Sequence, residues 1–410
     1  MQKMTSNISR LPIRNAHANA AGKDDPGSLR ARALTAAEVA AKYADAVDRE
    51  GRFPSEAFQA IRDQRLLGVL IPAALGGEDA SASEVVDVCY ILGRACASSA
   101  MIYAMHQVKV ACLVRHSGGN VWHEGLQRGI AERQLLMASS TTEGANGGNI
   151  RSSEAAIQIK DARIALERNA SVISYGEHAD GIVTTARRAG AAASSDQVLV
   201  AFLKQDYTLE RTQSWDTLGM RGTCSTGFIL RAQGELDQIL PEPYDRIHTQ
   251  TMMPFAHLFW SAAWSGIAAG AVQRARAFVR KAARAAEGKL PPAAAHLTRA
   301  RVSLESLRGT VQAALRKFEL HSNDPQSLNA IDIQVALNFL KVETSELAVT
   351  IVMSAMRACG LAGYRNDGEF SMGRYLRDIL SSPIMINNDR ILADSQAAVL
   401  MSDTPAGLSE

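Results

Sequence analysis

Apolar residues follow a helical period in the first third of the chain. From Ala36 to Val47 they recur every three or four positions, which predicts an amphipathic helix. Pro54 begins a shorter helical pattern, and apolar stretches at 83–95 and 98–115 predict two further helices. We therefore expect a helical N-terminal domain over residues 29–135. Residues 1–28 are polar and lack a helical stripe, so we expect them to form a disordered leader.

The pattern changes at about residue 136. Apolar and polar residues now alternate in short segments, as in half-buried strands, at 156–159, 163–166, 181–184 and 197–203. Runs rich in Gly, Ala, Ser and Asn separate these segments and indicate turns. We expect a β domain over residues 136–245, folded as a small barrel or sandwich.

Long helical patterns return in the last part of the chain. They cover 255–286, a stretch from Pro291 to His321, and 325–359, where Gly360 provides a stop. Long helices without intervening strands are typical of a bundle. The sequence thus predicts an α+β protein: a helical domain, a β domain, and a C-terminal four-helix bundle over residues 246–410.

Composition narrows the functional classes. The 44 basic and 42 acidic residues leave a net charge of +2, which gives no indication of a nucleic-acid partner. Apolar runs are too short for a membrane span. The five cysteines are expected to be free thiols in a reducing, cytoplasmic setting, and no metal site is predicted. No Gly-x-Gly-x-x-Gly lies between a strand and a helix, which disfavours a Rossmann unit.

Several short phrases resemble motifs of one family, and they occur in the family's order. They are Gly-Arg-Phe-Pro at 51–54, LLGVLIPAALGG at 66–77, Thr-Glu-Gly-Ala at 142–145, Ile-Ser-Tyr-Gly at 173–176, LGMRGT at 218–223, and RYLRDILSSPIMINNDRI at 374–391. On these residues the chain is identified as resembling the acyl-CoA dehydrogenase superfamily. The resemblance implies the same three-domain fold, a bound FAD, and a homodimer or homotetramer.

The resemblance also implies which residues hold the cofactor. Side chains expected at the flavin, by position, are Ser139, Thr141, Thr142 and Ser174, with a further hydrogen bond from Asn388. Hydroxyls suit this role because they tune the flavin without adding charge. Arg284 matches an arginine that reaches the cofactor pyrophosphate of a neighbouring subunit, and Gly360 and Gly363 match a glycine loop packed against that cofactor.

The chain departs from the family at the catalytic base. The Glu expected eight residues after Asp378 is Ile386, and an alternative family position for Glu, on the first bundle helix, is Ala256. Ile386 would still offer its backbone N–H to a substrate carbonyl, with Asn387 adding hydrogen bonds. His257 is the candidate for a replacement base, while His106 and Asp389 fit structural roles better.

These departures leave two enzymatic hypotheses. The first is FAD-dependent α,β-dehydrogenation of an acyl thioester, carried by CoA or by a carrier protein, with a non-standard base. The alternative is a monooxygenase or oxidase on the same fold, which uses reduced flavin and O₂ and needs no α-proton base. A non-catalytic homologue is a third reading. The sequence indicates neither the electron acceptor nor a flavin reductase.

Overall fold

The computed structural model describes residues 25, 27–144, 149–402, 404 and 407, so most of the predicted leader lies outside the described residues. Five helices and one 3-10 turn form the N-terminal part: α1 (Leu29–Glu50), α2 (Ser55–Asp63), η1 (Ala73–Leu75), α3 (Ala82–Ala95), α4 (Ala97–His116) and α5 (Val121–Arg133). The Ser81 hydroxyl and the Glu84 carboxylate form a capping box that begins α3. The helix α5 follows Asn120, whose side chain caps it, and was missed by the sequence pattern.

The β domain is a pair of small sheets packed against each other. One sheet has the order β1–β4–β5, from β1 (Met137–Ser140), β4 (Gly181–Arg187) and β5 (Gln197–Leu203). The other has the order β2–β3–β7–β6, from β2 (Gln158–Lys160), β3 (Arg163–Ile173), β7 (Thr226–Glu235) and β6 (Tyr207–Arg211). The short helical turns between strands are η3 (Gly176–His178), η4 (Lys204–Asp206), η5 (Arg221–Thr223) and η6 (Leu236–Gln238).

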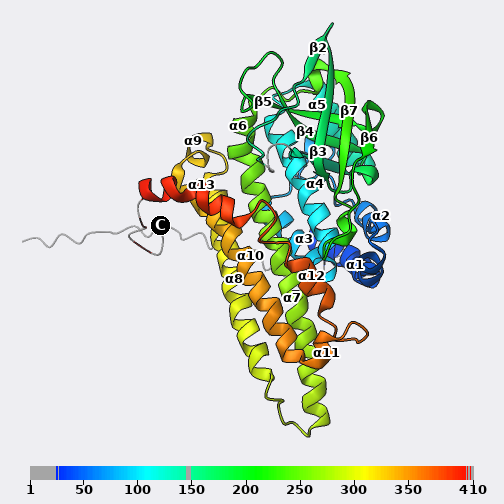
Figure 1. Ribbon diagram of the computed structural model, residues 1–410, viewed down its shortest axis with the longest axis vertical. Coiled ribbons are helices and arrows are strands. Elements are labelled where there is room, and N and C mark those ends of the chain that lie inside the picture. Colours follow the sequence, from blue (N-terminus) through cyan, green and yellow to red (C-terminus); the bar gives the residue numbers. More distant parts are fainter. Residues whose placement is uncertain (1–24, 26, 145–148, 403, 405–406, 408–410) are drawn as a thin grey trace, which may run out of the picture.

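The C-terminal part is a helical bundle. Its long helices are α7 (Met253–Ala285), α8 (Ala294–His321) and α10 (Ile331–Cys359), and α13 (Asn388–Met401) packs against α10. Shorter elements connect them: α6 (Tyr244–Ile247), the π-helical turn η7 (His248–Met252), α9 (Pro325–Leu328), α11 (Leu361–Tyr364) and α12 (Gly373–Ile379). The strands gather at one end of the elongated molecule, and the long helices extend to the other (Figure 1).

Two glycines allow the N-terminal helices to dock closely on the bundle. A Cβ on Gly93 of α3 would lie 2.3 Å from the Ala263 carbonyl oxygen of α7, and one on Gly266 would lie 2.3 Å from the Tyr90 carbonyl oxygen. Neither position tolerates a side chain without moving backbone. The bundle helix α7 is therefore held against α3, and its first turns lie beside α4 as well.

The segment around α12 connects all three parts of the chain. Arg374 Nε donates to the Asp45 carboxylate on α1 at 2.8 Å, and Arg377 pairs with Asp48 on the same helix. Asp378 accepts a hydrogen bond of 2.7 Å from the backbone N–H of Met220, in the loop before η5. The Arg-x-x-Arg-Asp run therefore has an architectural role: it fixes the turn that carries Ile386 relative to the β domain.

The architecture agrees with the predicted order of helical, β and helical parts. The pattern predicted one helix over 325–359, whereas the chain breaks it into α9 and α10 at Asn329 and Ala330. All five cysteines are free thiols. Among the described residues, no helix combines the length and the apolar character needed to cross a membrane.

Candidate flavin and substrate site

The candidate cofactor residues gather at an open edge of the β domain. Strand β1 lies at the edge of its sheet and pairs with β4 on one side only in the described ladder. Ser139 lies in β1, and Thr141 and Thr142 directly follow it; all three are half-buried. An edge strand presents unpaired backbone N–H and C=O groups. Hydroxyls and backbone donors are thus available together along this short stretch.

The facing strand β3 becomes irregular at the same place. Its register with β7 shifts between Ala170 and Ile173, and Ser171 Oγ donates to Thr142 Oγ1 at 3.2 Å. Such bulges re-aim side chains and are frequent beside active sites. Ser174 follows the strand, half-buried, so β1 and β3 bring the four predicted hydroxyl residues to one edge.

A chain of hydroxyls continues from Ser174 into the loop before β7. Ser174 Oγ lies 2.7 Å from Ser225 Oγ, which lies 2.8 Å from Thr223 Oγ1. Thr223 Oγ1 donates in turn to the Met220 carbonyl oxygen at 2.8 Å. Sequence reasoning missed Thr223 and Ser225, although both belong to the Thr-rich phrase after LGMRG. The network fixes the Ser174 hydroxyl in place.

Ile386 occupies a strained turn before α13. Its φ is +55°, in the left-handed region that a β-branched side chain rarely adopts, and the next residue, Asn387, has φ +35°. The backbone N–H groups of Met385, Asn387 and Asn388 all donate to carbonyls, whereas that of Ile386 has no partner among the described residues. The turn therefore presents one free N–H donor, as the sequence reasoning required, and no carboxylate.

The two asparagines beside Ile386 have structural contacts. Asn387 is the N-cap of α13 and accepts from the Asp389 N–H at 3.0 Å, so Asn387 takes the capping role that the pattern favoured for Asp389. Asn388 is buried and points into the bundle, where Lys341 Nζ donates to its Oδ1 at 2.6 Å and its Nδ2 donates to Ser345 Oγ at 3.0 Å. Their catalytic and cofactor roles stay predictions.

The histidines considered from the sequence are deeply buried. His257 lies between α7 and α10, with Nδ1 3.0 Å from the Leu337 carbonyl oxygen, and burial lowers its pKa to about 4. Ala256 beside it is buried and inert. His106 accepts from the Met137 N–H at Nδ1 (3.0 Å), so Nε2 carries the proton and donates to the Leu67 carbonyl (2.9 Å). His106 therefore has both ring nitrogens occupied by backbone, which agrees with a structural role.

Arg284, Gly360 and Gly363 lie at the other end of the bundle. Gly360 ends α10 with φ +55° and ψ −137°, a conformation open to glycine, and a Cβ on Gly363 would lie 2.7 Å from the Cys359 Cβ. Arg284 is exposed near the end of α7. In Figure 1 this end, marked by α11, is far from the β domain. The structure thus separates these residues from Ser139 and Ser174, as a role toward a neighbouring subunit would require.

A hollow accompanies the glycine loop. It has a volume of about 490 Å³ and is lined by residues of α7 and of the loop after α11, among them Phe278, Lys281 and Phe370. Leu361 and Tyr364 beside it are 73% and 75% exposed.

Sequence reasoning overlooked two lysines in the interior. Lys341 of α10 is 0% exposed, and Lys109 of α4 is 3% exposed. The signal was present, because each lysine interrupts an apolar helical stretch at a position that faces inward. Their surroundings differ: Lys341 Nζ donates to two oxygens, whereas Lys109 Nζ faces a thioether sulfur.

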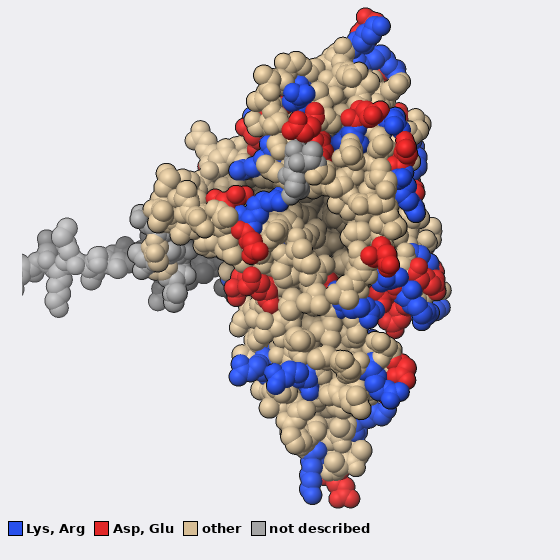
Figure 2. Space-filling view, viewed as in Figure 1, with Lys and Arg blue, Asp and Glu red and all other residues tan. Residues whose placement is uncertain are grey.

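The residues at the β-domain edge fit a flavin. Half-buried hydroxyls at Ser139, Thr141, Thr142 and Ser174, together with the open edge of β1, can satisfy the polar rim of an isoalloxazine ring. The space-filling view shows a hollow between the β domain and the helices of the bundle, in the region where Figure 1 draws α4 beside the upper part of α7 (Figure 2).

Comparison with known proteins agrees with this arrangement. Residues 29–121 match the family model of the acyl-CoA dehydrogenase N-terminal domain, and residues 249–400 match that of the C-terminal domain. SfnC of Pseudomonas putida, described as a probable FMNH₂-dependent monooxygenase, is 24% identical over 335 residues, covering 77% of this chain and 82% of SfnC. The cyclohex-1-ene-1-carbonyl-CoA dehydrogenase of Geobacter metallireducens is 23% identical over 351 residues, covering 84% and 89%.

Solved structures share the fold. FMN-bound TdsC from Paenibacillus sp. A11-2 superposes with a TM-score of 0.81 at 16% identity, covering 92% of this chain and 98% of TdsC. A nitrososynthase from Micromonospora carbonacea var. africana gives 0.75 at 21% identity, covering 90% and 96%. With both terminal domains matched and the three-part fold in place, the chain belongs to the acyl-CoA dehydrogenase superfamily of flavin-dependent enzymes.

Proposed function

We propose that this chain is a flavin-dependent monooxygenase that acts on a small molecule with reduced flavin and O₂. When bound, the flavin supplies two electrons, so that one oxygen atom enters the product and the other leaves as water. The sequence feature that supports the proposal is the residue pair Ile386 and Ala256, which by the resemblance stand at the two positions where the superfamily places a catalytic Glu. Removal of an α-proton needs such a base, whereas oxygen transfer does not.

His257 is a weak substitute for that base. Its pKa is lowered to about 4 by burial, and general bases work best when their pKa lies near the working pH. The similarity to SfnC, which is described as a probable FMNH₂-dependent monooxygenase, also supports oxygen transfer over dehydrogenation. In the proposed enzyme Ser139, Thr141, Thr142 and Ser174 hold the flavin, and the Ile386 N–H donates to an acceptor on the substrate.

The experiment that tests this function is oxygen labelling. Purified protein is supplied with chemically reduced FMN or FAD and ¹⁸O₂ in the presence of candidate substrates, and the products are analysed by mass spectrometry. We expect one ¹⁸O atom per product molecule. Flavin reoxidation with hydrogen peroxide as the sole product, across substrates that bind, would sink the proposal.

The identity of the flavin is a separate proposal. We propose FAD, because Arg284 is exposed at the end of the bundle where a neighbouring subunit's pyrophosphate would lie, in a homodimer or homotetramer. Arg284→Ala should then weaken FAD binding about tenfold and leave FMN binding unchanged, as measured by quenching of flavin fluorescence. Equal effects on both flavins would exclude this pyrophosphate contact. FMN-bound TdsC makes FMN the competing cofactor.

Dehydrogenation of an acyl thioester is the second candidate. The similarity to a cyclohexene-carbonyl-CoA dehydrogenase over most of both chains favours it, and CoA or a carrier protein would present the substrate. His257 would then act through Nε2, because Nδ1 faces the Leu337 carbonyl. His257→Ala should reduce enoyl-thioester formation by about 10²-fold or more. Unchanged formation of the enoyl product would remove His257 from this role.

A further inference from the structure

Lys109 is a buried cation with a poor partner. Its Nζ lies 3.4 Å from the Met252 thioether sulfur, which is its hydrogen-bond partner among the described residues. A thioether is a weak acceptor, and an ammonium group carries three donors. Removing such a charge from water without an anion costs several kcal/mol in a protein interior. The structure therefore leaves the ammonium group of Lys109 with little to compensate its burial.

The described groups that influence or neighbour Lys109, namely Cys112, Tyr244 and His248, do not provide a negative charge. Burial raises the pKa of Cys112 to about 12, and it raises the pKa of Tyr244 as well, so both stay neutral. Burial, together with the nearby Arg151, His257 and Lys109, lowers the pKa of His248 to about 3, so it too is neutral. Tyr244 Oη donates to Met252 Sδ at 3.5 Å and competes with Lys109 for the same sulfur.

A second cation lies nearby in the β domain. Arg168, buried between the two sheets, contacts Glu143 Oε1 through Nη1 at 2.8 Å, yet its Nε and Nη2 have no hydrogen-bond partner within the described part of the chain. Arg168 also lowers the pKa of Lys109, after burial itself. Because the Glu143 carboxylate pairs with Arg168, it does not neutralise the positive charge of Lys109. The buried His248 Nδ1 likewise finds no hydrogen-bond partner among the residues that the structure describes.

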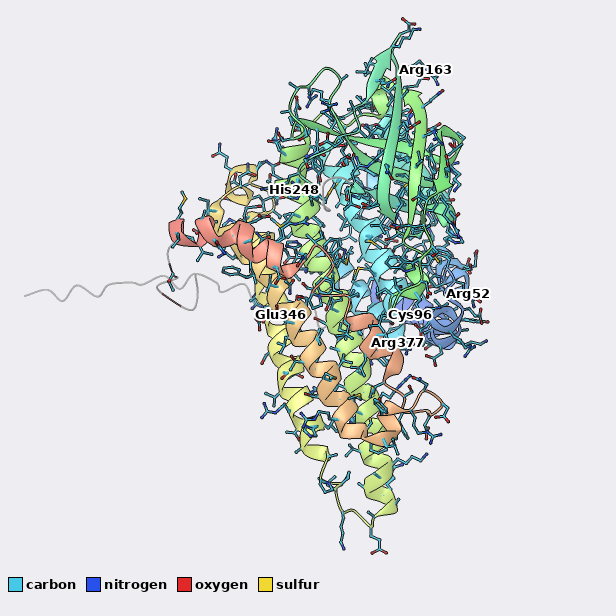
Figure 3. All side chains as sticks on the ribbon, in the orientation of Figure 1. Arg52, Cys96, Arg163, His248, Glu346 and Arg377 are labelled. Atoms are coloured by element: carbon cyan, nitrogen blue, oxygen red, sulfur yellow. The ribbon has the colours of Figure 1, made fainter. Side chains whose placement is uncertain are left out.

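These groups converge from elements that border the hollow. Lys109 comes from α4, Tyr244 from α6, and His248 and Met252 from the π-helical turn η7, a conformation that is frequent at functional sites. In Figure 3 His248 lies where the rod of α6 and α7 meets the β domain. The hollow of Figure 2 opens on this face of the molecule. Lys109, Tyr244, His248 and Met252 therefore come together where α4, α6 and η7 meet.

We propose that Lys109 is a substrate-recognition residue. The substrate then carries an oxyanion, either a carboxylate or a sulfonate, that pairs with the Lys109 ammonium group. An oxyanion supplies the acceptors that Met252 lacks and neutralises the remaining charge. The inference rests on the proposed function only in calling the anion a part of the substrate. The existence of the anion site is independent of whether the enzyme transfers oxygen.

The test uses small anions as probes of the flavin-loaded protein. Thermal melting is measured in acetate, methanesulfonate and chloride at equal ionic strength. We expect acetate, methanesulfonate or both to raise Tm saturably above chloride in the wild type, and the responding anion identifies the oxyanion. Lys109→Met should abolish the response, and Lys109→Arg should retain it. If Lys109→Met does not fold, the second neutral variant, Lys109→Gln, is measured in its place and should also lose the response.

Lys341→Met is the matched control, because Lys341 is the other buried lysine and is already partnered. It should lower Tm but keep the anion response. An equal response to chloride, no oxyanion response in the wild type, or an unchanged response in Lys109→Met would overturn the proposal. So would a tenfold loss of flavin affinity in Lys109→Met, because it would assign Lys109 to the cofactor. Failure of ¹⁸O incorporation with an intact anion response would instead reject only the oxygenase function.

Discussion

Two buried lysines show how differently one protein can treat the same charge. Lys341 donates to the Asn388 Oδ1 and the Ser382 carbonyl at 2.6 and 3.2 Å, and its ammonium lies 5.7 Å from the centre of the Trp264 ring. Lys109 has a thioether at 3.4 Å. Burial lowers the pKa of each to about 8. The hydrogen bonds of Lys341 hold the turn before α13 in place. Burial of Lys109 instead lowers the stability of the fold without forming a strong hydrogen bond, which is typical of a binding residue.

The largest effect should come from Glu143→Gln. This change removes the carboxylate that neutralises Arg168 and leaves that buried cation in the β domain without an anionic partner. Breaking a buried ion pair from one side costs about 3–5 kcal/mol. Chemical denaturation should therefore show a loss of this size. Glu346→Gln is the control, since Glu346 is exposed and accepts from Asn388, and it should change stability by less than about 0.5 kcal/mol. Figure 3 labels this residue on α10.

The next effect tests the partnered lysine. Lys341→Met should destabilise the protein by about 2–3 kcal/mol, because the Asn388 Oδ1 loses its strongest donor and the Ser382 carbonyl its lysine contact. Equilibrium unfolding in urea measures the loss. If Lys341→Met proved as neutral as a surface change, the contrast between the two lysines would disappear.

The smallest effect tests the unpartnered lysine and has the opposite sign. Lys109→Met should stabilise the anion-free protein by about 1–2 kcal/mol at pH 7, since a side chain of similar length replaces an uncompensated charge. The folded pKa of about 8 lies below the unfolded value of 10.5, so the unfolded wild type binds more protons between these limits and wild-type stability rises with pH there. The advantage of Lys109→Met should shrink from pH 8 to pH 10. An advantage independent of pH would contradict a buried charge at Lys109.

Most helices could be predicted from the sequence because their apolar periodicity is a local property of the chain. Periodicity located α1, α3, α4, α7 and α8 closely, and the strand β5 at Gln197–Leu203 matched its predicted range. Strands β6 and β7 were not singled out, because their pairing depends on distant partners such as β3. The break between α9 and α10 also escaped the pattern, since no Pro or Gly marks it.

The site was predictable in part. Motif order placed Ser139, Thr141, Thr142 and Ser174 at what proved to be one edge of the β domain. Side-chain contacts decided the rest: the orientation of Asn388 toward Lys341 depends on packing between α10 and α13, which no local phrase encodes. The backbone N–H of Ile386 was expected from the resemblance, but the left-handed turn that leaves it without a partner among the described residues was not, because β-branched residues rarely adopt that conformation.

The most direct measurement of the central claim is the absorbance of enzyme-bound oxidised flavin under anaerobic conditions. If Ile386 and Ala256 take the place of the superfamily's base, as we propose, the flavin should keep its visible absorbance across a panel of acyl-CoA thioesters, because their α-proton would not be removed efficiently. As a control, dithionite should remove the visible absorbance of the bound flavin, and O₂ added afterwards should restore that absorbance. Rapid anaerobic bleaching by any of these thioesters would contradict the account and make the chain a dehydrogenase.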